Sequence, residues 1–180
     1  NAGASNKNTT KDFFMASQSN LHTFNPNGSA KNFLSGQVLK INTYSIFNLS
    51  KKFFKPDLIR MDVEGHECEI ISGMLKYIKN GFFKPHICFE PHIGSYNVSN
   101  NFSDTLSKIF KLGYYTKLIS SNAENGTDRI SDLTKVNPFF TVTSDGEMRG
   151  IFKNLNNKDT IKILTEMGGA RTVLLSPKNI

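Results

Sequence analysis

The chain has 180 residues, of which 38% are hydrophobic and 21% are charged, a composition typical of one globular domain with a sizeable core. It has no run of the roughly 18 apolar residues that a transmembrane helix needs, and no signal-peptide pattern at its start. The formal net charge of +7 comes from scattered lysines, so we interpret it as a solvated surface and expect no nucleic-acid partner.

The first 40 residues are polar and are interrupted by "NPNGS", which predicts short strands or a hairpin joined by an exposed loop. An extended segment over 36–47 follows, and then a helical turn over 48–54 that Pro56 ends. Residues 57–63 ("DLIRMDV") are mostly apolar, as in a parallel strand buried on both faces. A helix is expected over 65–80, because apolar residues recur there at helical spacing, acids precede them and lysines follow.

The second half of the chain alternates strand-like and helix-like segments. The patterns predict strands over 87–90, 114–121 and 171–177, helices over 103–113 and 157–169, a loop over 122–131 and an extended piece over 138–147. This alternation indicates an α/β fold with a largely parallel sheet and no domain boundary. Cys68 and Cys88 form no CxxC pair, which favours reduced thiols in a cytoplasmic protein.

Polar residues follow two of the predicted strands. Asp62 and Glu64 come after 57–63, while Glu90 and His92 flank the proline that ends 87–90. Open parallel sheets bind ligands at the carboxyl ends of their strands, so these side chains are expected to share one crevice if the strands are neighbours. Acids at the end of a buried strand cost desolvation energy unless they serve a function.

The neighbouring acids have a simpler explanation. Glu67 and Glu69 begin the predicted helix, where the helix dipole favours negative charge whatever the function. His66 lies beside them and is a candidate for proton transfer, since the pKa of histidine lies near working pH. The acids and imidazoles together could act as a general base, hold a polyhydroxylated substrate or bind a divalent cation. No HExxH or CxxC pattern supports a metal, so no metal ligand is assigned.

The stretch 57–74, "DLIRMDVEGHECEIISGM", resembles the signature of the FkbM-type methyltransferases. The matching positions are Asp57, Asp62, Val63, Glu64, Gly65, Glu67 and Gly73. "HICFEPH" is similar to the next strand of the family, which ends in Glu, one residue and His, matched here by Glu90 and His92. Segments 1–16 and 27–33 are also similar to family segments, so the resemblance covers most of residues 1–120.

The resemblance implies a Rossmann-like class I methyltransferase sheet in three αβα layers. Residues 57–63 would be its fourth strand, 87–90 its fifth, and 114–121 with 171–177 its last, antiparallel pair. The glycine-rich turn and the ribose-binding acid of the family do not occur in this chain. We therefore expect residues 1–180 to form a single partial domain that begins near the third strand. Ser45 stands where the family often has an acid, whose role we interpret as a helix cap.

The resemblance also implies S-adenosylmethionine as cofactor and a hydroxyl oxygen as methyl acceptor. Asp62, Val63 and Glu64 are expected at the cofactor, and Glu64, Glu90 and His92 at the acceptor. Asp62, His66 and His92 are the candidate catalytic residues, with an imidazole as base and the Asp62 carboxylate favouring the sulfonium.

The acceptor would be a small molecule or glycan, namely a sugar, a glycolipid-like compound or a secondary metabolite. Two other classes of function stay open on the residues alone. One is a metal-dependent transferase or hydrolase that uses Asp62, Glu64, Glu90 and His92. The other is a non-catalytic basic module that binds an anionic polymer.

Overall fold

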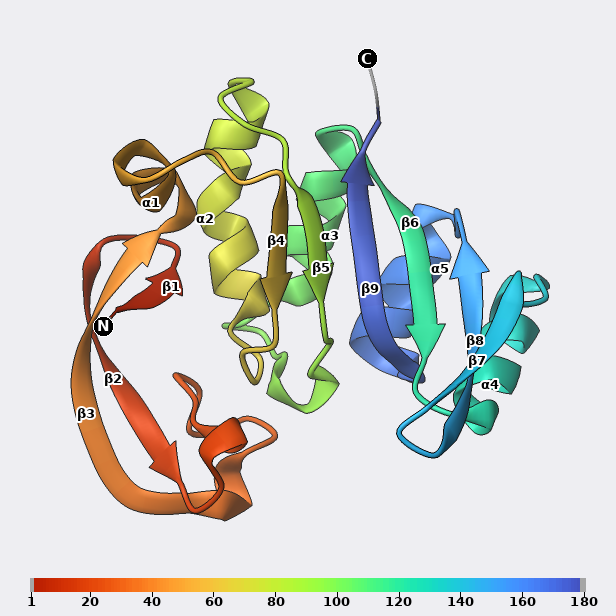
Figure 1. Cartoon of the computed structure of the whole chain (residues 1–180), viewed down its shortest axis with the longest axis horizontal. Coiled ribbons are helices and arrows are strands. Elements are labelled where there is room, and N and C mark those ends of the chain that lie inside the picture. The colour runs from red at the N-terminus through yellow and green to blue at the C-terminus, as the bar shows by residue number, and fades with distance from the viewer. Residues whose placement is uncertain (1, 179–180) are drawn as a thin grey trace.

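The computed structural model describes residues 2–178, which form a six-stranded sheet and a three-stranded sheet (Figure 1). The larger sheet has the order β4 (Leu58–Met61), β5 (His86–Phe89), β9 (Ala170–Pro177), β6 (Tyr114–Ser121), β8 (Glu147–Lys153) and β7 (Phe140–Ser144). β4 and β5 are parallel, whereas β9 is antiparallel to both of its neighbours, β5 and β6. The carboxyl ends of β4, β5 and β6 therefore lie along one edge of the sheet, where β9 begins.

Helices cover one face of this sheet. α2 (Glu67–Lys79), α3 (Phe102–Lys111) and α5 (Asn157–Lys162) lie behind the strands in Figure 1, and a π-helical turn, η4 (Ile163–Met167), continues α5. Side chains on that face are buried, including Ile87 and Phe89 of β5, whereas His86 and Cys88 on the other face are partly exposed. α2 forms where the sequence predicts it, with acids in its first turn and Lys76 and Lys79 in its last.

The opposite face of the sheet differs from expectation. Within residues 2–178, Figure 1 shows no helix over it, so the third layer of the predicted αβα arrangement is not found in the described part of the chain. The prediction that 57–63 is buried on both faces is wrong, because Leu58 is 57% exposed and Arg60 is also exposed. Only alternate residues of β4 contribute to the core.

The N-terminal region forms the small sheet, in the order β1 (Gly3–Ser5), β3 (Leu34–Ser45) and β2 (Thr9–Ala16). β2 and β3 are antiparallel, and the segment between them carries the short 3₁₀ turns η1 (Ser19–Leu21) and η2 (Lys31–Phe33). The predicted pairing of extended segments is confirmed, but the loop around "NPNGS" is only partly exposed, because Gly28 and Ala30 are buried. α1 (Ile46–Lys52) follows β3, and the Ser45 hydroxyl caps it by accepting a hydrogen bond from the Asn48 backbone N–H at 3.3 Å.

Two elements in the second half correct the predictions. Residues 122–131 were expected to be a loop, but α4 (Glu124–Thr134) is a helix that packs its buried Ile130 against β6 and β8. The extended piece over 138–147 pairs with an unpredicted strand, β8, through a turn at Asp145 and Gly146. Among the residues described, no helix is long and apolar enough to cross a bilayer.

Candidate functional site

The two polar segments found in the sequence meet at the carboxyl edge of β4 and β5. The strands pair in parallel with Met61 beside Phe89, and the backbone N–H of Glu90 donates to the Met61 carbonyl at 3.2 Å. Asp62 and Glu64 therefore face Glu90 and His92 across one edge, as the sequence analysis expected. We call these four residues the acid–imidazole cluster.

His92 is fixed by a carboxylate that the sequence analysis assigned to the helix alone. Its Nδ1 lies 2.9 Å from Oε1 of Glu67, a side chain with no exposed surface. The Tyr96 hydroxyl donates to Oε2 of Glu67 at 3.4 Å, and the Val63 backbone N–H donates to its Oε1 at 3.3 Å. Such a fully bonded buried carboxylate holds the imidazole in one orientation.

The remaining nitrogen of His92 points at the two strand-end acids. Nε2 lies 3.4 Å from Glu64 Oε1 and 3.7 Å from Asp62 Oδ1. Burial alone lowers the pKa of His92, but the hydrogen bond to Glu67 and the charges of Glu67, Glu64 and Glu90 outweigh it and raise the pKa to about 9. The cluster thus strongly favours a positive charge at this position.

Glu64 adopts an uncommon backbone conformation. Its φ is +50°, and Gly65 follows with φ +94°, so the chain turns sharply from β4 into α2. The turn is held because the Ser29 hydroxyl donates to Glu64 Oε2 at 3.0 Å and the Thr23 hydroxyl donates to the Glu64 carbonyl at 3.3 Å. A residue held in left-handed backbone against its preference is typical of a functional position.

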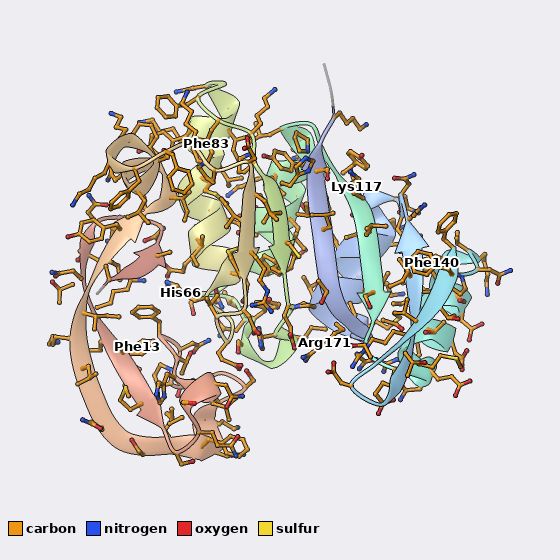
Figure 2. The ribbon with its side chains drawn as sticks, in the orientation of Figure 1. Phe13, His66, Phe83, Lys117, Phe140 and Arg171 are labelled. Carbon is orange, nitrogen blue, oxygen red and sulfur yellow. The ribbon has the colours of Figure 1, made fainter. Side chains whose placement is uncertain are left out.

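Glu90 faces a cation from another strand. Its carboxylate forms an ion pair with Arg171, the second residue of β9, beside the end of β5 (Figure 2). Burial raises the pKa of Glu90, Arg171 opposes the shift, and the charges of Asp62 and Glu64 add to it. Because Arg171 pairs with Glu90, the acids that face His92 Nε2 are Asp62 and Glu64.

His66 does not join the cluster. Its Nε2 lies 3.1 Å from the Ser5 hydroxyl, and its ring stacks on Phe24 with centroids 4.6 Å apart. Burial and the Lys11 charge lower the pKa of His66 to about 4. In Figure 2, His66 lies between the large sheet and the small sheet that carries Phe13, and far from Arg171.

Two pockets lie on the His66 side of the Gly65 turn. A polar pocket of about 310 Å³ contains amide and hydroxyl groups from Asn25, Asn27, Asn97, Ser99 and Asn100. A larger, mostly apolar pocket of about 570 Å³ separates the small sheet from α2 and is lined in part by Val63. Of the predicted site residues, the structure therefore brings together Asp62, Glu64, Glu90 and His92, and places His66 and the Val63 side chain elsewhere.

Sequence reasoning missed four partners of the cluster, namely Glu67, Ser29, Tyr96 and Arg171. A signal existed for Glu67, because it follows Glu64 by three residues and so lies within reach of the same edge. Ser29 and Arg171 reach the cluster only through long-range contacts, and no local pattern marks them.

A family model described as the methyltransferase FkbM domain matches residues 1–115, which include the whole acid–imidazole cluster and Glu67. No curated protein and no solved structure matches the chain.

Proposed function

Because the chain belongs to the FkbM methyltransferase domain family, we propose that it methylates a hydroxyl oxygen of a sugar, glycolipid-like or secondary-metabolite acceptor, using S-adenosylmethionine. The observation that carries this proposal is the juxtaposition of the two family motifs. The DVEG turn after β4 and the Glu-x-His segment after β5 form one polar edge, where α/β sheets bind their ligands.

The strand order supports a Rossmann-like class I fold for residues 1–180, taken as part of one methyltransferase domain. Only β4 and β5 pair in parallel in the described part of the large sheet, so the expected largely parallel sheet is not found. β4, β5, β9 and β6 are nonetheless neighbours in that order, with β9 antiparallel to β5 and β6. This is the arrangement that the family resemblance implies for its fourth and fifth strands and its last pair.

The negative charge at the carboxyl end of β4 complements the positive charge of the proposed cofactor. S-adenosylmethionine supplies an electrophilic methyl group on a positively charged sulfonium. Asp62 and Glu64 place two carboxylates at this edge, and the backbone of Val63 between them is fixed by its hydrogen bond to Glu67. Carboxylates favour a cation in a partly desolvated site. We therefore keep Asp62, Val63 and Glu64 as the proposed cofactor-facing residues.

O-methylation releases the hydroxyl proton, so the chain must orient the hydroxyl and receive that proton. Asp62 is our candidate, because its side chain is 37% exposed while its Oδ1 faces the rest of the cluster. Glu64, Glu90 and His92 would hold the acceptor around it. His92 is favoured over His66 as the catalytic imidazole, because only His92 lies within reach of the strand-end acids.

None of the cluster residues lines the polar pocket beyond the Gly65 turn, so we propose that this pocket holds a second, hydroxyl-bearing part of an extended acceptor. The asparagine side chains of the pocket offer both donors and acceptors, the combination that hydroxyl groups need. We accordingly propose a small-molecule or glycan partner and no nucleic acid. A cytoplasmic location fits Cys68 and Cys88, which are both free thiols.

The test is calorimetry with S-adenosylhomocysteine on the full-length gene product, followed by transfer of labelled methyl groups to a panel of sugars and glycolipids. We expect binding, and a labelled product that is lost in Asp62→Asn, with Asp104→Asn in α3 as the matched control. A failure to bind S-adenosylhomocysteine would contradict the proposal. Hydrolysis of a substrate without methyl transfer would favour the metal-dependent rival.

A further inference from the structure

We propose that Asp62, Glu64 and His92 form a binding site for one hard divalent cation of the Mg²⁺ or Mn²⁺ type. One ligand atom of each side chain lies within 4.8 Å of the ligand atoms of the other two. His92 Nε2 faces Glu64 Oε1 and Asp62 Oδ1.

Each of the three side chains is held by its other polar atom. Asp62 Oδ2 accepts from Arg60 at 3.5 Å, and Glu64 Oε2 accepts from the Ser29 hydroxyl at 3.0 Å. His92 Nδ1 is hydrogen-bonded to the buried Glu67 at 2.9 Å. The other polar atoms, Asp62 Oδ1, Glu64 Oε1 and His92 Nε2, face one another across the shared gap. A carboxylate behind a histidine, with the second ring nitrogen directed outward, is the arrangement that orients metal-ligating histidines.

The distances from His92 Nε2 to the two carboxylate oxygens are long for a strong hydrogen-bonded ion pair. Nε2 is 3.4 Å from Glu64 Oε1 and 3.7 Å from Asp62 Oδ1, longer than a good charge-assisted hydrogen bond of about 2.7–2.9 Å. Ligand bonds of about 2.1 Å in an octahedron put adjacent ligand atoms about 3 Å apart and opposite ones about 4.2 Å apart. The two separations from His92 Nε2 lie between these values, and the three ligand atoms lie within 4.8 Å of one another, so side-chain rotations can close the site around an ion.

The charge and the donor types select the class of ion. Arg171 pairs with Glu90 and Arg60 pairs with Asp62 Oδ2, so Asp62 Oδ1 and Glu64 Oε1 are the carboxylate oxygens that face the gap beside His92 Nε2. A bound cation would take the place of the proton that these acids favour on His92 Nε2. Two carboxylates are hard oxygen donors, the ligands that Mg²⁺ and Mn²⁺ take, and the set contains no thiolate. Three protein ligands leave half of an octahedral shell for water or for acceptor oxygens, and the 37% exposure of the Asp62 side chain gives access from solvent.

The test uses Mn²⁺ alone as the probe, with calorimetry and electron paramagnetic resonance on the 180-residue chain at neutral pH. We expect saturable binding of one ion that EDTA removes. His92→Gln and Asp62→Asn should abolish it, and Glu67→Gln should weaken it roughly 10–100-fold, because Glu67 only orients the ligand. The control is Glu69→Gln, an acid of the same helix turn that pairs with Lys11 at 3.0 Å and should leave affinity unchanged.

A second readout assigns the ion to this place. Of the four histidines, Mn²⁺ should broaden the imidazole NMR signals of His92 strongly and those of His22 least. Urea midpoints equal to that of the parent chain establish that each variant is folded. Absence of saturable binding, or equal binding by the parent and His92→Gln, would overturn the inference. Methyl transfer that survives EDTA leaves the proposed function intact, whereas Mn²⁺ binding without cofactor binding contradicts only the proposed function.

Discussion

Replacement of Gly65 by alanine tests how the chain turns from β4 into the acid–imidazole cluster. Gly65 has φ +94°, and a Cβ at this position would lie 2.1 Å from Ser95 Cβ and 2.6 Å from Ser95 Oγ. The left-handed backbone costs an L-residue about 1–2 kcal/mol, and overpacking adds about 1–3 kcal/mol. Gly65→Ala should therefore lower the free energy of unfolding by about 2–5 kcal/mol.

Urea denaturation measures this loss. With a slope of about 2 kcal/mol per molar urea, the midpoint should fall by about 1–2.5 M at unchanged slope. Gly81→Ala is the matched control, because Gly81 has φ +69° with no atom within 4 Å of a built Cβ, so only the backbone share of about 1–2 kcal/mol should appear.

A double-mutant cycle separates the two contributions. In a Ser95→Gly background the clash disappears, so Gly65→Ala should there cost no more than Gly81→Ala does. Equal losses for Gly65→Ala in both backgrounds would refute the steric argument. Equal losses for Gly65→Ala and Gly81→Ala in the parent chain would refute it as well.

Three further predictions concern other parts of the chain. Ser45→Ala should cost about 1 kcal/mol in urea denaturation, since it removes the hydroxyl that caps α1, and an unchanged midpoint would contradict this. Burial raises the pKa of the Cys68 thiol, so at pH 8 iodoacetamide should label it, by mass spectrometry, far more slowly in the native than in the unfolded chain; fast native labelling would contradict its burial. Arg149→Met should cost about 1–3 kcal/mol in thermal melts, because the buried guanidinium donates to the Ser121 and Asn122 carbonyls, and a parent-like melt would contradict this.

Local patterns predicted the elements whose signals lie within one segment. α2 has apolar spacing, leading acids and trailing lysines within 13 residues, and it forms as expected. α4 was missed because its sequence is polar and contains Gly126, and glycine has a low helix propensity. Its helix is stabilised by tertiary packing, since Ile130 is fully buried and a Cβ on Gly126 would lie 2.6 Å from the Gly169 carbonyl oxygen.

The hairpin that leads into β8 does have a local sequence signal, the Asp-Gly pair at 145–146. Asp145 and Gly146 have φ +54° and +78°, the two positive values that an Asp-Gly hairpin turn requires. The sheet face opposite the helices was mispredicted for a different reason. A short apolar run such as 57–63 has the same appearance whether one or both of its faces are covered.

The polar side chains from Asp62 to Glu69 lie on two sides of the turn at Glu64 and Gly65. Asp62 and Glu64 lie at the end of β4 and face His92, whereas His66 turns to Ser5 and Glu69 pairs with Lys11 of β2 at 3.0 Å. The left-handed conformations of Glu64 and Gly65 cause this separation, because they turn the chain between the strand-end acids and the residues that begin α2.

Glu67 alone among these acids points inward, where helix-dipole electrostatics accounts for its charge but not for its complete burial. An ionised carboxylate is buried in this way only when it is paired, and its partner is His92. The acid that the sequence explained most easily is therefore the one that orients the imidazole of the site. The same helix position that favours its charge also places it beneath the carboxyl edge of β4 and β5.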